Sequence, residues 1–186
     1  MMRRICFHGA ESTGKSVLAE RLSRELGIPW VPEYGREYAE AHGTHFTMAD
    51  LLAIAAGHED QVRALEADGA ATAILDTDPL MTAAWARMLF GAVPGELLAY
   101  PKADLYLLFD ADVPWIEDGT RLFGTHGERA RFAAIAETIL IETGVPFTRI
   151  GGNWADRGAR ARTAIAALIR AVDQDPHRNH RSDRLD

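Results

Sequence analysis

Residues Gly9 to Ser16, with the sequence GAESTGKS, constrain the fold more than any other part of the chain. They fit the pattern G-x-x-x-x-G-K-[ST], in which two glycines frame a loop that ends in a lysine and a hydroxyl residue. The apolar segment Ile5–Phe7 precedes the loop, and Lys15–Leu26 follows it with a leucine at every fourth position from Leu18. A strand, a glycine-rich loop and an amphipathic helix in this order predict a phosphate-binding loop (P-loop).

The chemistry of such a loop comes mainly from its backbone. Glycine tolerates backbone angles that other residues avoid, so successive N–H groups turn inward and surround phosphate oxygens. The N-terminus of the following helix adds partial positive charge. Lys15 can reach the β- and γ-phosphates of ATP, and the Ser16 hydroxyl is a ligand for Mg²⁺. The residues expected to bind the nucleotide are Gly9, Glu11, Ser12, Thr13, Gly14, Lys15, Ser16 and Val17.

Five short apolar segments predict the strands of one sheet, and helical patterns separate them. Strands that alternate with helices pair in parallel through right-handed crossovers, which gives a three-layer α/β fold. The second segment is the weakest candidate, because prolines flank it. The candidate strands are residues 5–7, 30–31, 73–75, 105–109 and 147–150. The expected fold class is therefore a P-loop NTPase with a five-stranded parallel sheet.

Composition narrows the function before any further site is considered. The 186 residues suffice for one domain of roughly 100–200 residues. The 27 acidic and 20 basic residues give a net charge of -7, whereas nucleic-acid binders normally present a basic surface, so we expect no nucleic-acid partner. One cysteine excludes an internal disulfide and fits a reducing compartment. No apolar run approaches the roughly 20 residues that span a bilayer, so we expect a cytoplasmic protein without a membrane partner.

Two segments differ in composition from the rest of the chain. Residues 111–131 are rich in Asp, Gly and Arg, and a loop of this length in a compact domain is typically a functional lid. Residues 173–186 carry a single large apolar residue, Leu185, and are expected to form a polar tail. The predicted organisation is one P-loop domain over residues 1–172 with this lid segment. The oligomeric state stays open, a homo-oligomer included.

Two carboxylates follow the third predicted strand, in the sequence Leu75-Asp76-Thr77-Asp78-Pro79. In an open parallel sheet, ligands bind outside the carboxyl ends of the strands. We expect Asp76 to be the acidic partner of Mg²⁺, directly or through water, and Asp78 to contribute to substrate binding. The alternative for Asp78, which precedes Pro79, is that its side chain caps the next helix.

A third carboxylate, Glu33, follows the second predicted strand in the segment VPEYGREY. Beside bound phosphates it can take the proton of an acceptor hydroxyl or anchor the substrate, and Arg36 can hold a substrate or phosphate oxygen. The alternative for Glu33 is a solvated loop acid. Tyr34, Tyr38 and Trp85 are further candidates for substrate binding, because each offers an aromatic face.

Arginines in the expected lid, Arg121 and Arg129, are candidates for stabilising charge that moves between phosphates. The alternative is that they are ordinary surface arginines, of which the chain has many. His58 shares a helical face with apolar residues, so we interpret it as a hydrogen-bonded core residue. The expected catalytic set is Lys15, Glu33, Asp76, Arg121 and Arg129.

Four segments, GAESTGKS, VPEYGREY, LDTDP and VPWIEDGTR, occur in this order, and Arg129 and Phe132 follow the last. Together they resemble the nicotinamide riboside kinase domain of NadR-type proteins, over most of the chain. The resemblance implies a P-loop kinase fold related to nucleoside monophosphate kinases. It implies transfer of the ATP γ-phosphate to the ribose 5′-hydroxyl of nicotinamide riboside, which gives nicotinamide mononucleotide. Related kinases hold adenine where Asn153 and Trp154 follow the fifth strand.

The chain departs from this family in one respect. NadR-type proteins often carry a DNA-binding module and an adenylyltransferase domain, whereas this sequence starts just before its first predicted strand. We therefore expect a stand-alone kinase. Two other functions stay open: a P-loop kinase for another nucleoside or small metabolite, and a nucleotide-binding regulatory module. The sequence lacks the N/T-K-x-D guanine motif of small GTPase switches, and Glu33 as an acceptor-side acid favours an enzyme.

Overall fold

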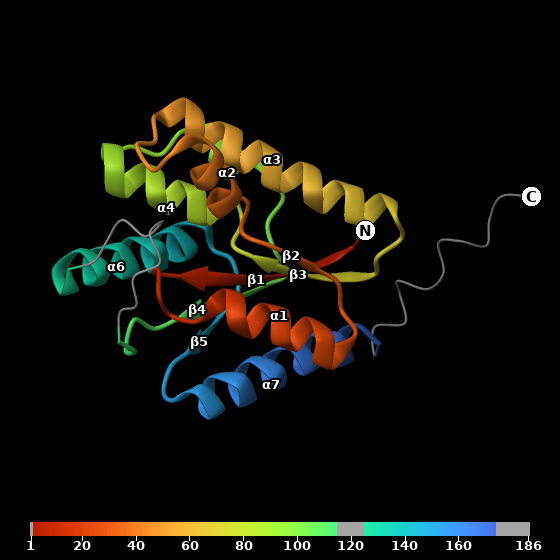
Figure 1. Cartoon of the computed structure of the whole chain (residues 1–186). Coiled ribbons are helices and arrows are strands. Elements are labelled where there is room, and N and C mark those ends of the chain that lie inside the picture. The colour runs from red at the N-terminus through yellow and green to blue at the C-terminus, as the bar shows by residue number, and fades with distance from the viewer. Residues whose placement is uncertain (1, 115–124, 174–186) are drawn as a thin grey trace, which may run out of the picture.

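The five strands in a computed structural model of the chain form one sheet, in which all neighbouring strands are parallel (Figure 1). The structure describes residues 2–114 and 125–173. The order across the sheet is β2-β3-β1-β4-β5, so β1 occupies the centre. The strands are β1 Arg3–Gly9, β2 Trp30–Val31, β3 Thr72–Asp76, β4 Leu105–Phe109 and β5 Phe147–Ile150. Every predicted strand is confirmed, including the short one between the prolines.

Helices cover both faces of this sheet. In Figure 1, α1 and α7 lie on one face, whereas α2, α3, α4 and α6 lie on the other, which confirms the expected three-layer architecture. Within the described ranges, no helix combines the length and the apolar character that a membrane crossing needs. The helices are α1 Lys15–Leu26, α2 Tyr34–His42, α3 Met48–Ala67, α4 Pro79–Phe90, α5 Gly95–Ala99, α6 His126–Thr143 and α7 Trp154–Asp173.

Two hydrophobic cores, one on each face, hold these helices to the sheet. Successive side chains of a strand point to opposite faces. In β1, Ile5 and Phe7 pack with α1 and α7, whereas Cys6 packs with α3, α4 and α6. All three side chains are fully buried. A central strand that is buried on both faces has to be apolar on both, which is why its middle reads as a continuous apolar run.

Capping boxes fix where two of the helices begin. One box begins α3: the Asp50 amide donates to Thr47 Oγ1 at 3.2 Å, and the Thr47 amide donates to Asp50 Oδ2 at 2.7 Å. A second box, formed by Thr125 and Glu128, begins α6 at His126. Residues 126–131 of the expected lid range are therefore helical. Phe132 is the first large apolar residue of α6, so the apolar periodicity alone would begin this helix several residues after His126.

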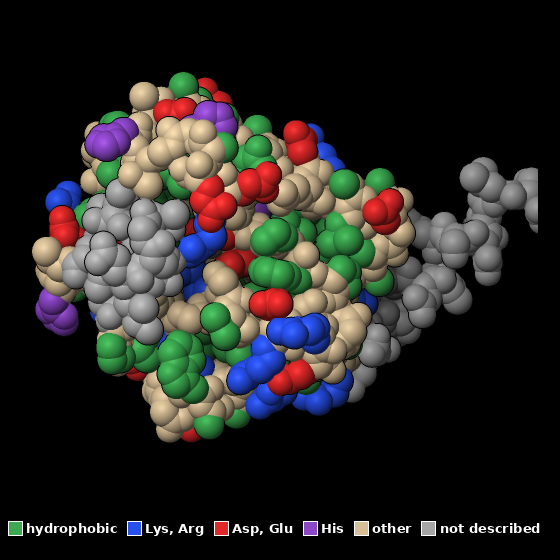
Figure 2. Space-filling model, viewed as in Figure 1, with side chains coloured by type: hydrophobic (Ala, Val, Ile, Leu, Met, Phe, Trp, Pro, Cys, Tyr) green, Lys and Arg blue, Asp and Glu red, His purple; other side chains and the backbone are tan. Residues whose placement is uncertain are grey.

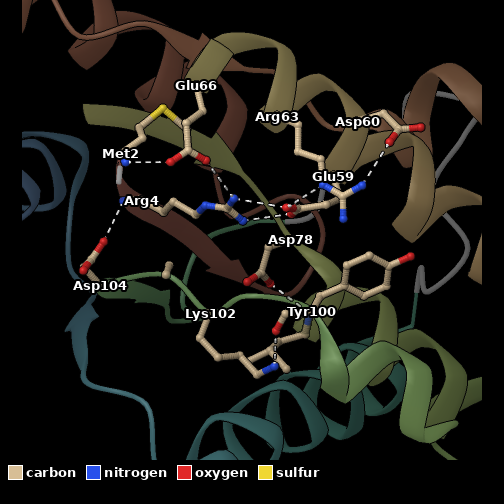
Figure 3. Close-up of polar contacts among 12 residues, drawn as sticks. Met2, Arg4, Glu59, Asp60, Arg63, Glu66, Asp78, Tyr100, Lys102 and Asp104 are labelled. Atoms are coloured by element: carbon tan, nitrogen blue, oxygen red, sulfur yellow. Dashed lines mark hydrogen bonds and ion pairs between the residues drawn. The ribbon is translucent and has the colours of Figure 1, made fainter. Parts of the chain in front are cut away.

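An ion-pair network fastens the beginning of β1 to α3 and to the loop before β4 (Figure 3). The Arg4 guanidinium is buried and donates to both Glu59 carboxylate oxygens, at 2.8 and 3.1 Å. The Arg4 amide donates to Asp104 Oδ2 at 2.8 Å, and the Met2 amide donates to Glu66 Oε1 at 2.9 Å. Because desolvation offsets much of the attraction in a buried pair, we interpret the network as fixing the position of β1. It lies at the opposite end of β1 from the P-loop.

Candidate active site

The P-loop connects the carboxyl end of β1 to α1. Gly9 and Gly14 have φ angles of +129° and +82°, in the region that favours glycine. At Gly9 the chain also passes close to β4, where an added Cβ would lie 2.6 Å from a backbone carbonyl oxygen. Inside the loop, the Thr13 hydroxyl and the Lys15 ammonium both donate to the Ala10 carbonyl, at 2.9 and 2.7 Å. These bonds close the loop into a compact turn of the kind whose N–H groups surround a phosphate.

A cavity of about 300 Å³ opens onto the P-loop and continues between α2, α3 and α4. Its loop end is polar, whereas its far end is apolar and aromatic. Figure 2 shows acidic and basic side chains next to each other near the middle of the face of the molecule that it presents. The size and the mixed lining are typical of a small-molecule site. The lining residues are 11–17, Glu33, Gly35, Arg36, Ala39, Phe46, Leu51, Ile54, Thr77, Met81, Thr82 and Trp85.

Asp76 ends β3 and is 1% exposed. Its carboxyl group is hydrogen-bonded to the Ser16 side chain, and its Oδ1 atom has no partner within the described part of the chain. Burial first, and then the charge of Glu33, raise the pKa of Asp76 to about 7. The Ser16 hydroxyl and the Asp76 carboxylate offer two oxygen ligands beside the P-loop, and the Asp76 Oδ1 atom has no hydrogen-bond partner in the described structure. Oxygen ligands of this kind are those that Mg²⁺ prefers. Asp76 and Ser16 are the residues that would hold this ion.

Glu33 and Arg36 line the polar end of the same cavity. Glu33 directly precedes α2, yet its side chain makes no cap hydrogen bond. Its Oε2 atom lies 3.9 Å from Arg36 Nε. The negative charge of Glu33 contributes to the raised pKa of Asp76. The Glu33 side chain is 29% exposed and lines the cavity, which favours the functional interpretation over a solvated loop acid.

Thr77 separates the two aspartates and was missed by the sequence reasoning. Its φ angle of 75° is rare for a β-branched residue. The Thr77 amide donates to the Phe7 carbonyl at 3.1 Å, and the residue lines the cavity. Such a conformation costs of order 1–3 kcal/mol and gathers at functional sites. Here it turns the chain so that Asp76 lies beside the P-loop while Asp78 lies beneath α4.

Asp78 is the N-cap of α4, which is the alternative that the sequence left open. Its Oδ1 atom accepts from the Leu80 and Met81 amides at 3.0 and 3.3 Å, and its Oδ2 atom accepts from the Tyr106 hydroxyl at 2.5 Å. Burial raises the pKa of this carboxyl. Asp78 is not among the cavity-lining residues. The described structure therefore gives it a structural role, and it does not support the expected contact with substrate.

Of the three aromatic candidates, one lines the cavity and two are partly buried against neighbouring side chains. Trp85 lines the cavity, with its ring 6.4 Å from that of Phe46 in an edge-to-face arrangement. The Tyr38 hydroxyl donates to Asp50 Oδ1 at 2.7 Å, and its ring stacks on His42. The Tyr34 ring contacts α3 where Gly57 leaves space for it. Trp85 lines the cavity and the two tyrosines do not, and the substrate contacts of all three stay predictions.

The two lid arginines have different outcomes. Arg121 lies outside the described residues. Arg129 lies in the first turn of α6 and is 7% exposed. Its Nη2 donates to the Val113 carbonyl at 3.1 Å. Arg129 thus joins α6 to the chain that follows β4 and does not line the cavity, and its action on phosphates stays a prediction.

Asn153 and Trp154 begin α7 beside the P-loop. Asn153 Oδ1 accepts from the Ala155 and Asp156 amides, at 2.9 and 3.0 Å, so this side chain caps the helix. The Trp154 ring is 53% exposed and lies against Gly14, where any side chain would overlap it. An exposed aromatic face next to the P-loop is consistent with a contact to the nucleotide base, which stays a prediction.

His58 is buried, as expected, but the expected hydrogen bond is absent. It is 3% exposed, and neither ring nitrogen has a partner among the residues that the structure describes. Burial, with a smaller contribution from the charge of Arg4, lowers its pKa to about 4. His58 is therefore neutral at pH 7.

The sequence matches the model of an AAA domain family over residues 4–157. The chain belongs to this AAA domain family. The trifunctional NAD biosynthesis/regulator protein NadR of Escherichia coli is 28% identical to it over 156 residues, which cover 80% of the chain and 38% of that protein. NadR of Salmonella typhimurium gives the same values. The chain thus spans well under half the length of these relatives, and the resemblance to NadR-type proteins is confirmed.

Solved structures agree on the fold of this AAA domain. A NadR protein in complex with NR matches it with a TM-score of 0.69 at 23% identity, over 89% of this chain and 50% of that one. Thymidylate kinase from Candida albicans matches with a TM-score of 0.63 at 18% identity, over 92% of both chains. Deoxyadenosine kinase from M. mycoides gives 0.56 at 12%, over 91% and 98%. These likenesses confirm the P-loop kinase fold.

No sequence pattern predicts which residues line the apolar end of the cavity in this AAA domain. Leu51 and Ile54 belong to the apolar stripe of α3, and both are buried. Phe46 lies in the loop before that helix, and Met81 lies in α4. Helical periodicity predicts that such residues are buried, but it does not tell which of them border a cavity.

The raised pKa of Asp76 gives a testable titration. With the carboxyl carbons of aspartate labelled with ¹³C in the nucleotide-free protein, we expect a resonance that titrates near pH 7 and is missing from D76N. In E33Q this midpoint should move to lower pH, because the negative charge that disfavours ionisation of Asp76 is removed. A midpoint near the ordinary aspartate value of about 4, unchanged in E33Q, would contradict the described geometry.

Proposed function

We propose that this AAA domain is an ATP-dependent kinase that phosphorylates the ribose 5′-hydroxyl of nicotinamide riboside to give nicotinamide mononucleotide. The observation that carries the proposal is the single cavity in which the P-loop and an acid-bearing, aromatic compartment meet. A donor phosphate at the loop and an acceptor in that compartment would share one cavity. The names of the NadR relatives and of a NadR structure with NR support this choice of acceptor.

Each part of a phosphoryl transfer has a candidate group that lines the cavity or, in the case of Asp76, is hydrogen-bonded to a lining residue, Ser16. The P-loop N–H groups and Lys15 would bind the phosphates, and Asp76 with Ser16 would hold Mg²⁺, which neutralises charge on the β- and γ-phosphates. The acceptor oxygen forms a bond to the γ-phosphorus as the bond to the ADP oxygen breaks. Glu33 would take the proton of the hydroxyl. Positioning and charge stabilisation are most of what this reaction asks of a protein.

The far end of the cavity suits a planar, positively charged ring. Nicotinamide riboside carries such a ring, and an aromatic face attracts a cation that lies over it. Trp85, an aromatic candidate from the sequence, lines the cavity at this end, and Glu33 lines its polar end. Phe46 and Met81 add apolar surface around the space beside Trp85. The Trp85 ring at this end and the negative charge of Glu33 in the same cavity would favour a cationic nucleoside over a neutral one.

A kinase for another nucleoside or nucleotide is the second candidate. Thymidylate kinase and deoxyadenosine kinase share the fold, and a fold does not fix the substrate. Both candidates require the same P-loop and the same acid. They differ in the group that occupies the aromatic end of the cavity.

The role of Glu33 as the base gives the first prediction for activity. E33Q keeps the shape of the side chain but cannot accept the proton, so kcat should fall by about 10²-fold or more. Steady-state kinetics at saturating Mg-ATP and acceptor measure this directly. An unchanged kcat with a raised KM for the acceptor would instead make Glu33 a substrate anchor.

The acceptor is tested by ADP release in a coupled assay with Mg-ATP and a panel of nicotinamide riboside, uridine, cytidine, deoxyadenosine and thymidylate. We expect the highest kcat/KM with nicotinamide riboside. The control is K15A, which should fold but show no turnover with any acceptor, because the phosphates lose their cation. Equal or higher kcat/KM for a neutral nucleoside would refute the proposed acceptor while leaving a kinase.

A further inference from the structure

Arg157, in the first turn of α7, is fully buried and bonded to three separate segments of the chain. Its Nε donates to the Gly152 carbonyl at 2.8 Å, before α7. Its Nη1 donates to the Thr13 carbonyl of the P-loop at 3.1 Å. Its Nη2 donates to the Asp110 carbonyl at 3.1 Å and to the Asp112 carboxylate, both just after β4. No sequence motif marked this residue.

These contacts need an arginine and no other residue. An arginine stays charged, so its burial is costly unless its donors are paired. The planar, rigid fork of the guanidinium meets carbonyls from several directions at once, which the single ammonium of a lysine cannot do. The rings of Phe109 and Trp154 lie 6.0 and 5.9 Å from its central carbon and complete the surroundings.

The bond to Thr13 determines how the next peptide group is oriented. Thr13 and Gly14 share a planar trans peptide, in which the C=O and the N–H point in opposite directions. The Thr13 carbonyl is turned toward the buried Arg157. The Gly14 N–H is therefore turned the other way, and Gly14 lines the cavity. N–H groups at this position, where a loop enters a helix, are the ones that bind phosphate oxygens.

We propose that Arg157 is a positioning residue of the nucleotide site. By holding the Thr13 carbonyl, it keeps the Gly14 N–H directed at a phosphate oxygen of the bound nucleotide. The inference rests on the proposed function for the nucleotide, but not for the acceptor. If Arg157 were only part of the scaffold, its replacement would lower stability and leave the affinity of the folded protein for nucleotide unchanged.

The first test measures nucleotide affinity without any acceptor. R157M removes the donors but keeps a long side chain, and the Kd for Mg-ATP in titration calorimetry should rise by about 10- to 100-fold, as for other residues that orient a binding group. The matched control is R162M on the same helix, where an exposed arginine pairs with Glu25 at 2.8 Å. R162M should leave the Kd unchanged. An unchanged Kd in folded R157M would overturn the proposal.

The second test observes the peptide group itself. Threonine labelled with ¹³C at the carbonyl and glycine labelled with ¹⁵N mark two peptide bonds in this sequence, Thr13–Gly14 and Thr143–Gly144. In the wild type, Mg-ATP should move the Gly14 amide proton downfield as it binds phosphate, while the Gly144 signal at the end of α6 stays in place. R157M should lose this shift. A shift that persists in R157M, or that is absent from the wild type, would contradict the proposal.

R157K keeps the inference testable if R157M does not fold. It preserves the charge but not the fork, so it should weaken Mg-ATP binding and reduce the Gly14 shift. Wild-type affinity and a wild-type shift in R157K would overturn the assignment. Both measurements are made without an acceptor, so a chain that binds Mg-ATP as expected but does not phosphorylate nicotinamide riboside refutes the proposed function alone.

Discussion

The turn from β1 into α1 is the constraint on which the rest of the structure depends. β1 is the central strand, so its side chains build both cores, and its carboxyl end sets where the P-loop stands. Its register with the neighbouring strands places Phe7 opposite Asp76 and Gly9 opposite Phe109. Asp76 thereby arrives beside Ser16, and the end of β4 passes close to Gly9. Once this turn is formed, the acid and the phosphate loop are brought together by strand pairing alone.

The fold and the centre of the site could be predicted because local patterns encode them. The P-loop, the five strands and Asp76 each depend on a short segment and on the rule that parallel strands end at one edge. The sequence offered two roles for Asp78, and the positive φ angle at Thr77, which no sequence pattern predicts, accompanies its placement at the N-cap of α4. Tyr38 and Asp78 found hydrogen-bond partners 12 and 28 residues away in sequence. Arg157 joins residues up to 144 positions apart, so its role exists only after folding.

The local arrangement of charges around the P-loop matters more for the site than the net charge of the molecule. A net charge of -7 coexists with a P-loop that offers a lysine, a helix N-terminus and a buried arginine beneath it. The pKa of Asp76 is raised by burial and by Glu33, and the positive charges of Lys15 and Arg36 oppose that shift. The cavity thus has opposite charges set side by side at its loop end. This is the arrangement in which the charge of a triphosphate, a metal ion and an acceptor hydroxyl can be balanced.

The central claim is that phosphate moves from ATP to the 5′-hydroxyl of a cationic nucleoside in this cavity. Phosphorus-31 NMR of the protein with Mg-ATP and nicotinamide riboside tests it most directly. We predict a new monoester resonance, split by the two 5′-methylene protons, that grows in step with ADP. ADP that accumulates with inorganic phosphate and without a monoester, or no consumption of ATP at all, would contradict the account.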